Sequence, residues 1–254
     1  MKKNVKVINI PTVFTALNLF SGFMAAVLTA AGNFVNAAWF IFFAAVFDSL
    51  DGRIARASGN SSEFGLQMDS LSDVVSSGLA PSLIIYEFHL KAFGHIGLIL
   101  SFLPLLFSAF RLARFNVFTA KFGKQNDYVG LPAPMAAVTL ASLVIFYYHT
   151  QWQFLLRMLV VLAPLVSLLM ISTLKYDGFP VFSFKEKGAN RIKLIIFFTV
   201  LVLFIFFPHF VLFPFMIVYL LYSPIRMLAR MFKNEEQEIA FIPDEEEQIV
   251  PNKK

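Results

Sequence analysis

Eight long apolar stretches restrict the folds open to this chain. They cover roughly residues 12–31, 34–55, 66–88, 93–115, 130–149, 153–173, 192–207 and 209–231. About 20 apolar residues allow an α-helix to cross a bilayer. The last two stretches share one apolar run that Pro208 and Pro214 interrupt, and a break near Pro208 and His209 would make a tight hairpin. The fold class predicted is all-α: a polytopic membrane helix bundle of about eight transmembrane helices (six to eight).

Composition supports a membrane protein and bears on its partners. Hydrophobic residues make up 58% of the chain and charged residues only 15%, whereas soluble domains have about 45–50% and 25%. The formal net charge is +5, but the basic residues flank apolar segments, which favours anionic lipid headgroups over nucleic acid as their partners. The absence of cysteine rules out disulfides and thiol catalysis.

The distribution of lysine and arginine predicts the orientation. If the N-terminus is cytoplasmic, nineteen of the 21 basic residues lie on the inner side, and only Lys91 and Arg157 lie outside. We therefore expect an integral protein of the cell inner or plasma membrane, with an uncleaved first span and both termini cytoplasmic. Residues 1–233 form a single membrane domain in this prediction. Residues 234–254, with the strings E-E-Q-E and D-E-E-E, form an acidic cytoplasmic tail expected to be disordered.

Four carboxylates lie where apolar spans meet the predicted cytoplasmic loop. Asp48 and Asp51 are three residues apart at the end of the second span, and Asp69 and Asp73 are four apart at the start of the third. Each spacing places its pair on one helix face. Such acids cost roughly 2.5–3.5 kcal/mol each near the centre of a bilayer, so they need a cation or a wet site. Oxygen ligands suit a divalent cation, Mg²⁺ or Mn²⁺, and a metal pair would also clamp a pyrophosphate.

The residues around the acids suit a diphosphate ligand. Gly52 and Ala55 leave no bulk beside the acids, and Gly65 precedes the second acidic pair. Arg56 can form a fork of hydrogen bonds with phosphate oxygens. Together these residues are the predicted nucleotide- or diphosphate-binding set.

The full motif, D-x2-D-G-x2-A-R-x8-G-x3-D-x3-D, is met between Asp48 and Asp73 without departure. It resembles the signature of the CDP-alcohol phosphatidyltransferases, which transfer a phosphatidyl group from a CDP-linked lipid to an alcohol and release CMP. The resemblance implies that the four aspartates bind metal and that Asp73 is also the general base. It implies that Gly52, Ala55 and Gly65 line the cytidine site, and that the protein is a homodimer.

Three further sequence strings, less specific than the aspartate motif, narrow the choice of acceptor alcohol. S-S-G-L-A-P-S after Asp73, F-R-L-A-R-F-N at 110–116 and G-L-P-A-P at 130–134 resemble the branch of the family that uses serine. The expected substrates are then CDP-diacylglycerol and L-serine, and the products are phosphatidylserine and CMP. Arg111 and Arg114 are candidates to bind the serine carboxylate or a lipid phosphate. Ordinary anchoring of a span by basic residues is the alternative for both.

Other interpretations remain open at this point. Another alcohol, such as glycerol 3-phosphate or inositol phosphate, is a second candidate acceptor, and a cation transporter is a candidate of a different class. A transporter would favour acids deep within spans or at broken helices. Thr15, Asn18 and Gly22 recur at near-helical spacing in the first span, where they either pack against a helix or contact a ligand. His89, His95, His149 and His209 all map to the outer edge and are excluded as metal ligands.

Overall fold

The computed structural model describes residues 10–58, 63–122, 128–176, 203, 204 and 206–239. Its long helices are α1 (Ile10–Ala30), α2 (Phe34–Ser58), α5 (Gly94–Phe122), α6 (Ala133–Thr150), α7 (Phe154–Ile171) and α9 (Pro208–Ile239). Six helical stretches, one in each of these regions, are long and apolar enough to cross a membrane. The prediction of an all-α polytopic membrane bundle is confirmed.

The predicted third span is helical but divided. It consists of α3 (Glu63–Asp73), a π-helical turn η1 (Val74–Leu79) and α4 (Ala80–Phe88), and a short 3₁₀ turn η2 (Leu90–Phe93) leads into α5. Proline has no amide hydrogen, so Pro81 cannot donate to the carbonyl four residues earlier. That missing bond gives a local reason for the wider turn just before Pro81.

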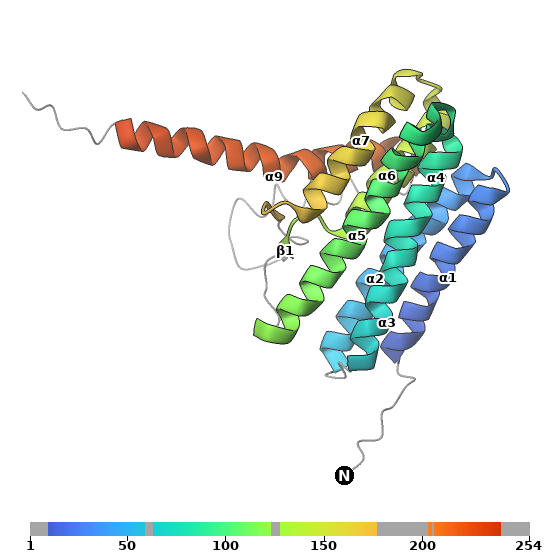
Figure 1. The fold of residues 1–254 in the computed structure, drawn as a ribbon, viewed down its shortest axis with the longest axis horizontal. Helices are drawn as coiled ribbons and strands as arrows, with labels where there is room; N and C mark the ends of the chain where they lie inside the picture. The colour runs from blue at the N-terminus through green and yellow to red at the C-terminus, as the bar shows by residue number, and fades with distance from the viewer. Residues whose placement is uncertain (1–9, 59–62, 123–127, 177–202, 205, 240–254) are drawn as a thin grey trace, which may run out of the picture.

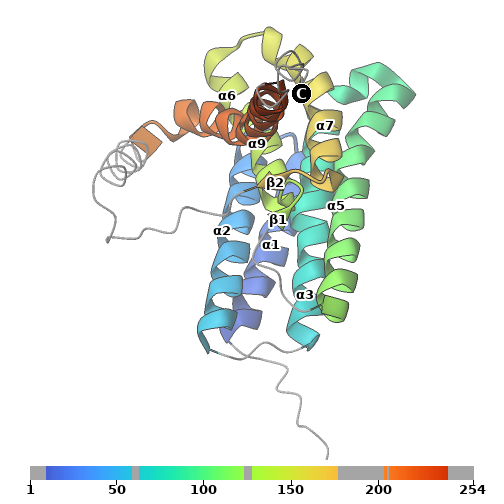
Figure 2. The same ribbon diagram turned by 90° about the vertical axis from the view of Figure 1, so that its left-hand side faces the viewer.

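The long helices from α1 to α7 run side by side and alternate in direction (Figures 1 and 2). The ends of α2, α5 and α7 and the starts of α1 and α3 therefore face the same way. Helix α6 lies at the centre of the bundle, and every residue from Ala136 to Ile145 is buried. It packs against α2, α7 and α9, and it also meets η1.

A two-stranded ladder that the apolar pattern does not predict joins two loops. Strand β1 (Tyr128–Val129) pairs with the antiparallel strand β2 (Lys175–Tyr176). The next residue after β1, Gly130, has φ of +84° and donates its amide to Leu174 O at 2.8 Å. Any Cβ at Gly130 would collide with the carbonyl of Met170, so glycine is required by both conformation and space. The string G-L-P-A-P thus brings the chain from the ladder into α6.

The last helix departs from the direction of the bundle. The predicted break near Pro208 is confirmed, because Phe207 is not helical and α9 begins at Pro208. In Figure 1, α9 runs across the other long helices and its far part projects beyond them. Among the residues of α9 whose side chains are described, the buried apolar ones are Leu212, Phe213, Met216 and Leu220.

Two predicted segments are described only in part. Most of the predicted seventh span, 192–207, lies outside the described residues. Helix α9 continues to Ile239, so the predicted tail begins within a helix, and residues 240–254 are not described. The division at residue 233 stays a prediction.

Candidate active site

The acidic motif lies on two neighbouring helices: Asp48 and Asp51 stand within α2, and Asp73 is the last residue of α3. We expected Asp48 and Asp51 to end the second span and a loop of about ten residues to follow. The predicted end of the second span agrees with the structure, in which the stretch apolar enough to cross a membrane is Phe34–Ala55. The expected loop of about ten residues is wrong, because α2 continues to Ser58 and α3 already begins at Glu63. Loss of hydropathy marks where a helix meets the headgroup region, whereas the string R-I-A-R-A still has the propensity to continue the helix. The acids therefore stand on regular helical backbone, which holds them more firmly than a loop would.

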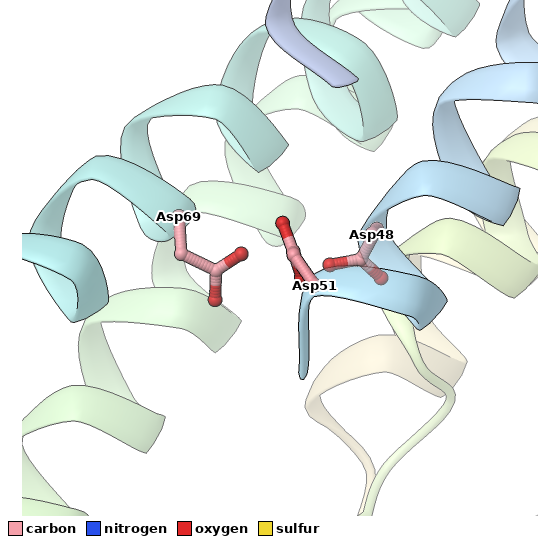
Figure 3. Close-up of side chains that lie close together, drawn as sticks. All are labelled: Asp48, Asp51 and Asp69. Atoms are coloured by element: carbon pink, nitrogen blue, oxygen red, sulfur yellow. The ribbon is translucent and has the colours of Figure 1, made fainter. Parts of the chain in front are cut away.

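Three of the four aspartates form one cluster. Carboxylate oxygens of Asp48, Asp51 and Asp69 all lie within 4.8 Å of one another. Figure 3 shows Asp69 on α3 pointing across to Asp48 and Asp51 on α2. Two negative charges about 5 Å apart repel by roughly 3 kcal/mol at an effective dielectric constant near 20. The donor set and its spacing fit a divalent cation that prefers oxygen ligands, and such an ion would remove this repulsion.

Asp73 stands beside this cluster and is held differently. Its side chain is only 6% exposed, and it lies close enough to Asp48 for the two carboxyl groups to interact. One of its oxygens, Oδ1, accepts a hydrogen bond of 3.0 Å from Asn18 Nδ2. The structure thus brings all four predicted acids together, with three in a single cluster and the fourth directed toward α1.

Helix α1 is the support for both acid-bearing helices. The hydroxyl of Thr15 donates to Asp51 Oδ2 at 2.9 Å, and Ser72 on α3 donates to the backbone carbonyl of Thr15 at 3.3 Å. Thr15 and Asn18 are both buried. The spacing of Thr15 and Asn18 singled them out in the sequence, where packing and ligand contact were both open. The structure shows that they bond to the acids themselves.

The residues predicted to bind the nucleotide lie around the cluster. Gly52 follows Asp51 on α2 and is half-buried, as is Ala55 one turn later. Gly65 is half-buried near the start of α3. Arg56 lies in the last turn of α2, and its side chain falls outside the described part of the structure. The positions suit a ligand next to the acids, and the nucleotide-binding role of these four residues stays a prediction.

The structure separates the two arginines that the sequence treats as a pair. Arg111 on α5 is 9% exposed and close enough to Asp48 for its positive charge to act on that carboxyl group. Arg114 is exposed, and its Nη1 donates to the carbonyl oxygen of Ile171 at 3.1 Å, at the last residue of α7. A cation at a helix C-terminus satisfies carbonyl groups that have no partner within the helix. Arg111 is thus placed to act in the site, while Arg114 has a structural contact.

Two polar residues near the site belong to strings quoted from the sequence, but no individual role was predicted for them. Asn116 on α5 donates through Nδ2 to Ser70 Oγ on α3 at 2.9 Å, and Ser76 is buried one turn beyond Asp73. No spacing rule links Asn116 to Ser70, which is 46 residues away. Of the excluded histidines, His149 at the end of α6 and His209 at the start of α9 stack on each other with centroids 4.0 Å apart.

Comparison with protein families gives one matching family model. The model for CDP-alcohol phosphatidyltransferases matches residues 8–169, well over half of the chain. The matched region includes α1 and all four aspartates, so it covers both the acids and the helix that supports them.

Curated relatives resemble most of the chain. A CDP-diacylglycerol–serine O-phosphatidyltransferase of Helicobacter pylori is 35% identical over 225 residues, which cover 88% of this chain and 92% of the relative. A protein of the same name from Methanocaldococcus jannaschii is 34% identical, over 88% and 96% of the two chains. An archaetidylserine synthase of Methanothermobacter thermautotrophicus is 38% identical, over 69% and 72%.

Proposed function

The chain belongs to the CDP-alcohol phosphatidyltransferase family, and we propose that it makes phosphatidylserine. In this reaction the hydroxyl of L-serine receives the phosphatidyl group of CDP-diacylglycerol, and CMP leaves. The observation that carries the proposal is the cluster of Asp48, Asp51 and Asp69 with Asp73 beside it. Serine as the acceptor is supported by the names of the three relatives, all of which include serine.

The acid cluster is the proposed binding site of the divalent cation. Asp48, Asp51 and Asp69 would hold Mg²⁺ or Mn²⁺, and Asp73 is the fourth candidate ligand. A divalent cation bound there would neutralise the diphosphate and the charge that develops on the departing CMP. Gly52, Ala55 and Gly65 leave room for the cytidine end of the donor, and Arg56 pairs with its phosphate oxygens.

Asp73 is the general base in this proposal. It accepts the proton of the serine hydroxyl while the serine oxygen forms a new bond to the lipid-linked phosphorus. The bond from that phosphorus to the CMP oxygen breaks, and CMP carries away the electron pair. Asn18 donates to Asp73 Oδ1, and Oδ2 would accept the proton of the hydroxyl. Arg111, which is buried near Asp48, would bind the serine carboxylate.

We assign the acidic end of the bundle to the cytoplasm. The alternating helices place the acid motif, Arg111 and the end of α7 at one end, and Lys91 and Arg157 near the other. The excess of basic residues predicted for the acidic end then follows the positive-inside rule. Serine and CMP are water-soluble, so a site at this end would exchange both with the cytoplasm. The predicted homodimer is a further part of this proposal.

An acceptor panel tests the proposal. Purified protein is incubated with CDP-diacylglycerol and Mn²⁺ or Mg²⁺, and CMP release is followed with L-serine, glycerol 3-phosphate or inositol phosphate. We expect CMP release to need L-serine and the lipid product to be phosphatidylserine. Release driven by a phosphorylated alcohol instead would assign the chain to another acceptor. No CMP with any alcohol, together with cation transport in vesicles, would contradict a transferase.

A further inference from the structure

Asn18 has one polar atom that the acid cluster does not account for. The side chain is fully buried, and its Nδ2 donates to Asp73 Oδ1. A carboxylate oxygen accepts hydrogen bonds, so the amide must turn its nitrogen toward Asp73. The carbonyl oxygen Oδ1 then remains buried, with no hydrogen-bond partner among the residues that the structure describes. Buried polar atoms rarely remain without a partner, so this oxygen points to a ligand.

The surroundings hold Asn18 in this orientation. One turn further along α1, a Cβ on Gly22 would lie 2.7 Å from Ser76 Cα, so α1 and η1 touch there. Ser76 Oγ is a second buried polar atom that lacks a partner in the described part of the chain. The π-helical turn that contains Ser76 begins directly after Asp73, and such turns occur frequently at functional sites. Close backbone contact on one side and the bond to Asp73 on the other leave Asn18 little freedom to turn.

The chemistry around Asn18 Oδ1 restricts which group of a ligand can bind to it. A carbonyl oxygen can only accept a hydrogen bond, so its partner must be a donor. Asp73 and its three acidic neighbours surround the site with negative charge. A cationic donor also gains from their charge, whereas a carboxylate or phosphate oxygen has no hydrogen to donate to a carbonyl oxygen. An amino alcohol offers such a donor, an ammonium group two bonds away from the carbon that carries its hydroxyl.

We propose that Asn18 Oδ1 accepts a hydrogen bond from the ammonium group of the acceptor alcohol. Through Nδ2 the same side chain holds Asp73, so one amide positions the base and orients the substrate that the base deprotonates. Asn18 thereby selects α-amino alcohols over alcohols that lack the amine. This inference rests on the proposed transfer to serine and adds a specificity-determining residue to it.

The test compares two acceptors that differ only in the amine: L-serine and 3-hydroxypropanoate. Asn18→Leu keeps a similar volume and removes both polar atoms, and Asn18→Ala serves if the leucine variant does not fold. The measured quantity is kcat/KM for CMP release with each acceptor, at raised enzyme concentration where needed. We expect the preference for serine over 3-hydroxypropanoate to fall about tenfold in the variant, with the KM for serine rising. Thr15→Val, which removes the hydrogen bond to Asp51, is the matched control and should leave the preference unchanged.

The outcomes separate the inference from the function on which it rests. If kcat/KM fell equally for both acceptors, Asn18 would only position Asp73, and the inference would be overturned. If additional Mn²⁺ restored the activity of the variant, Asn18 Oδ1 would be a metal ligand, and this result would also overturn the inference. If the native protein shows no serine-dependent CMP release, the proposed function itself is wrong.

Discussion

Asp73 differs from the other three aspartates in what holds it. Asp48, Asp51 and Asp69 face one another, whereas one oxygen of Asp73 is bonded to Asn18. A base needs an oxygen directed toward the hydroxyl, and serine is a weak nucleophile at neutral pH without one. Asp73→Asn keeps the size and one oxygen ligand but removes the basicity. We expect binding of the CDP-lipid to survive and turnover to fall by about 10²- to 10⁴-fold.

Asp48→Asn provides the comparison, because Asp48 lies inside the cluster and should hold metal. Its replacement should weaken metal binding and donor binding together. Donor binding and turnover are measured for both variants. If Asp73→Asn kept more than about a tenth of the native turnover, which is above the range for a lost base, Asp73 would be a ligand and not the base.

The two arginines should respond differently to truncation. Arg111→Ala removes a buried cation beside Asp48 and should raise the KM for serine more than the KM for the lipid donor. Arg114→Ala removes a contact to the end of α7 and should mainly lower the temperature of unfolding. Steady-state kinetics with each substrate varied, and thermal unfolding in detergent, distinguish the two. Equal rises of both KM values for Arg111→Ala would assign Arg111 to the structure or to the lipid phosphate.

For single residues, the sequence predicted the acids of the site but not the side chains that form hydrogen bonds with them. The spacing within each pair places both members on one helix face, and this follows from helix geometry alone. The bond from Asn18 to Asp73 joins residues 55 positions apart, and the bond from Thr15 to Asp51 joins residues 36 apart. Such contacts depend on how α1 packs against α2 and α3, which no local pattern encodes.

Helix α1 fits against η1 because Gly22 has no side chain. The Cβ of an alanine there would lie 2.7 Å from the backbone of Ser76, so one helix must move. Gly22→Ala should therefore destabilise the protein by about 1–3 kcal/mol, the usual cost of overpacking, although alanine favours helix by up to about 1 kcal/mol. Thermal unfolding in detergent measures this loss. Ala16→Leu, which adds bulk at an exposed position of α1, is the control, and an unchanged unfolding temperature for Gly22→Ala would show that the contact is loose.

The apolar pattern predicted which segments are helical better than where the helices end. The predicted stretches 12–31 and 130–149 correspond closely to α1 and α6, but α2 and α5 continue past the hydrophobic boundary to Ser58 and Phe122. Hydropathy shows where the chain leaves the hydrocarbon core of the membrane, whereas the ends of a helix depend on backbone propensity and packing. The π-helical turn after Asp73 and the pairing of β1 with β2 arise from tertiary contacts, so the pattern could not show them.

The bundle as a whole presents its acids at one end, and this end should face the cytoplasm. The chain has no cysteine, so each introduced cysteine is a unique label. Trp152→Cys and Thr173→Cys lie just outside opposite ends of α7, and both positions are exposed. In intact cells, an impermeant maleimide should label Trp152→Cys and leave Thr173→Cys unlabelled until the membrane is opened. The reverse pattern would place the site on the outer side and contradict the assigned orientation.

The central claim for the whole molecule is that its acid cluster holds a divalent cation needed for phosphatidyl transfer. The most direct test follows CMP release from CDP-diacylglycerol and L-serine before and after chelation with EDTA. We predict that EDTA abolishes the release and that Mn²⁺ or Mg²⁺ in excess restores it. Without the ion, the carboxylates, whose oxygens lie within 4.8 Å of one another, repel each other and the donor diphosphate. Full CMP release in the presence of the chelator would contradict this account.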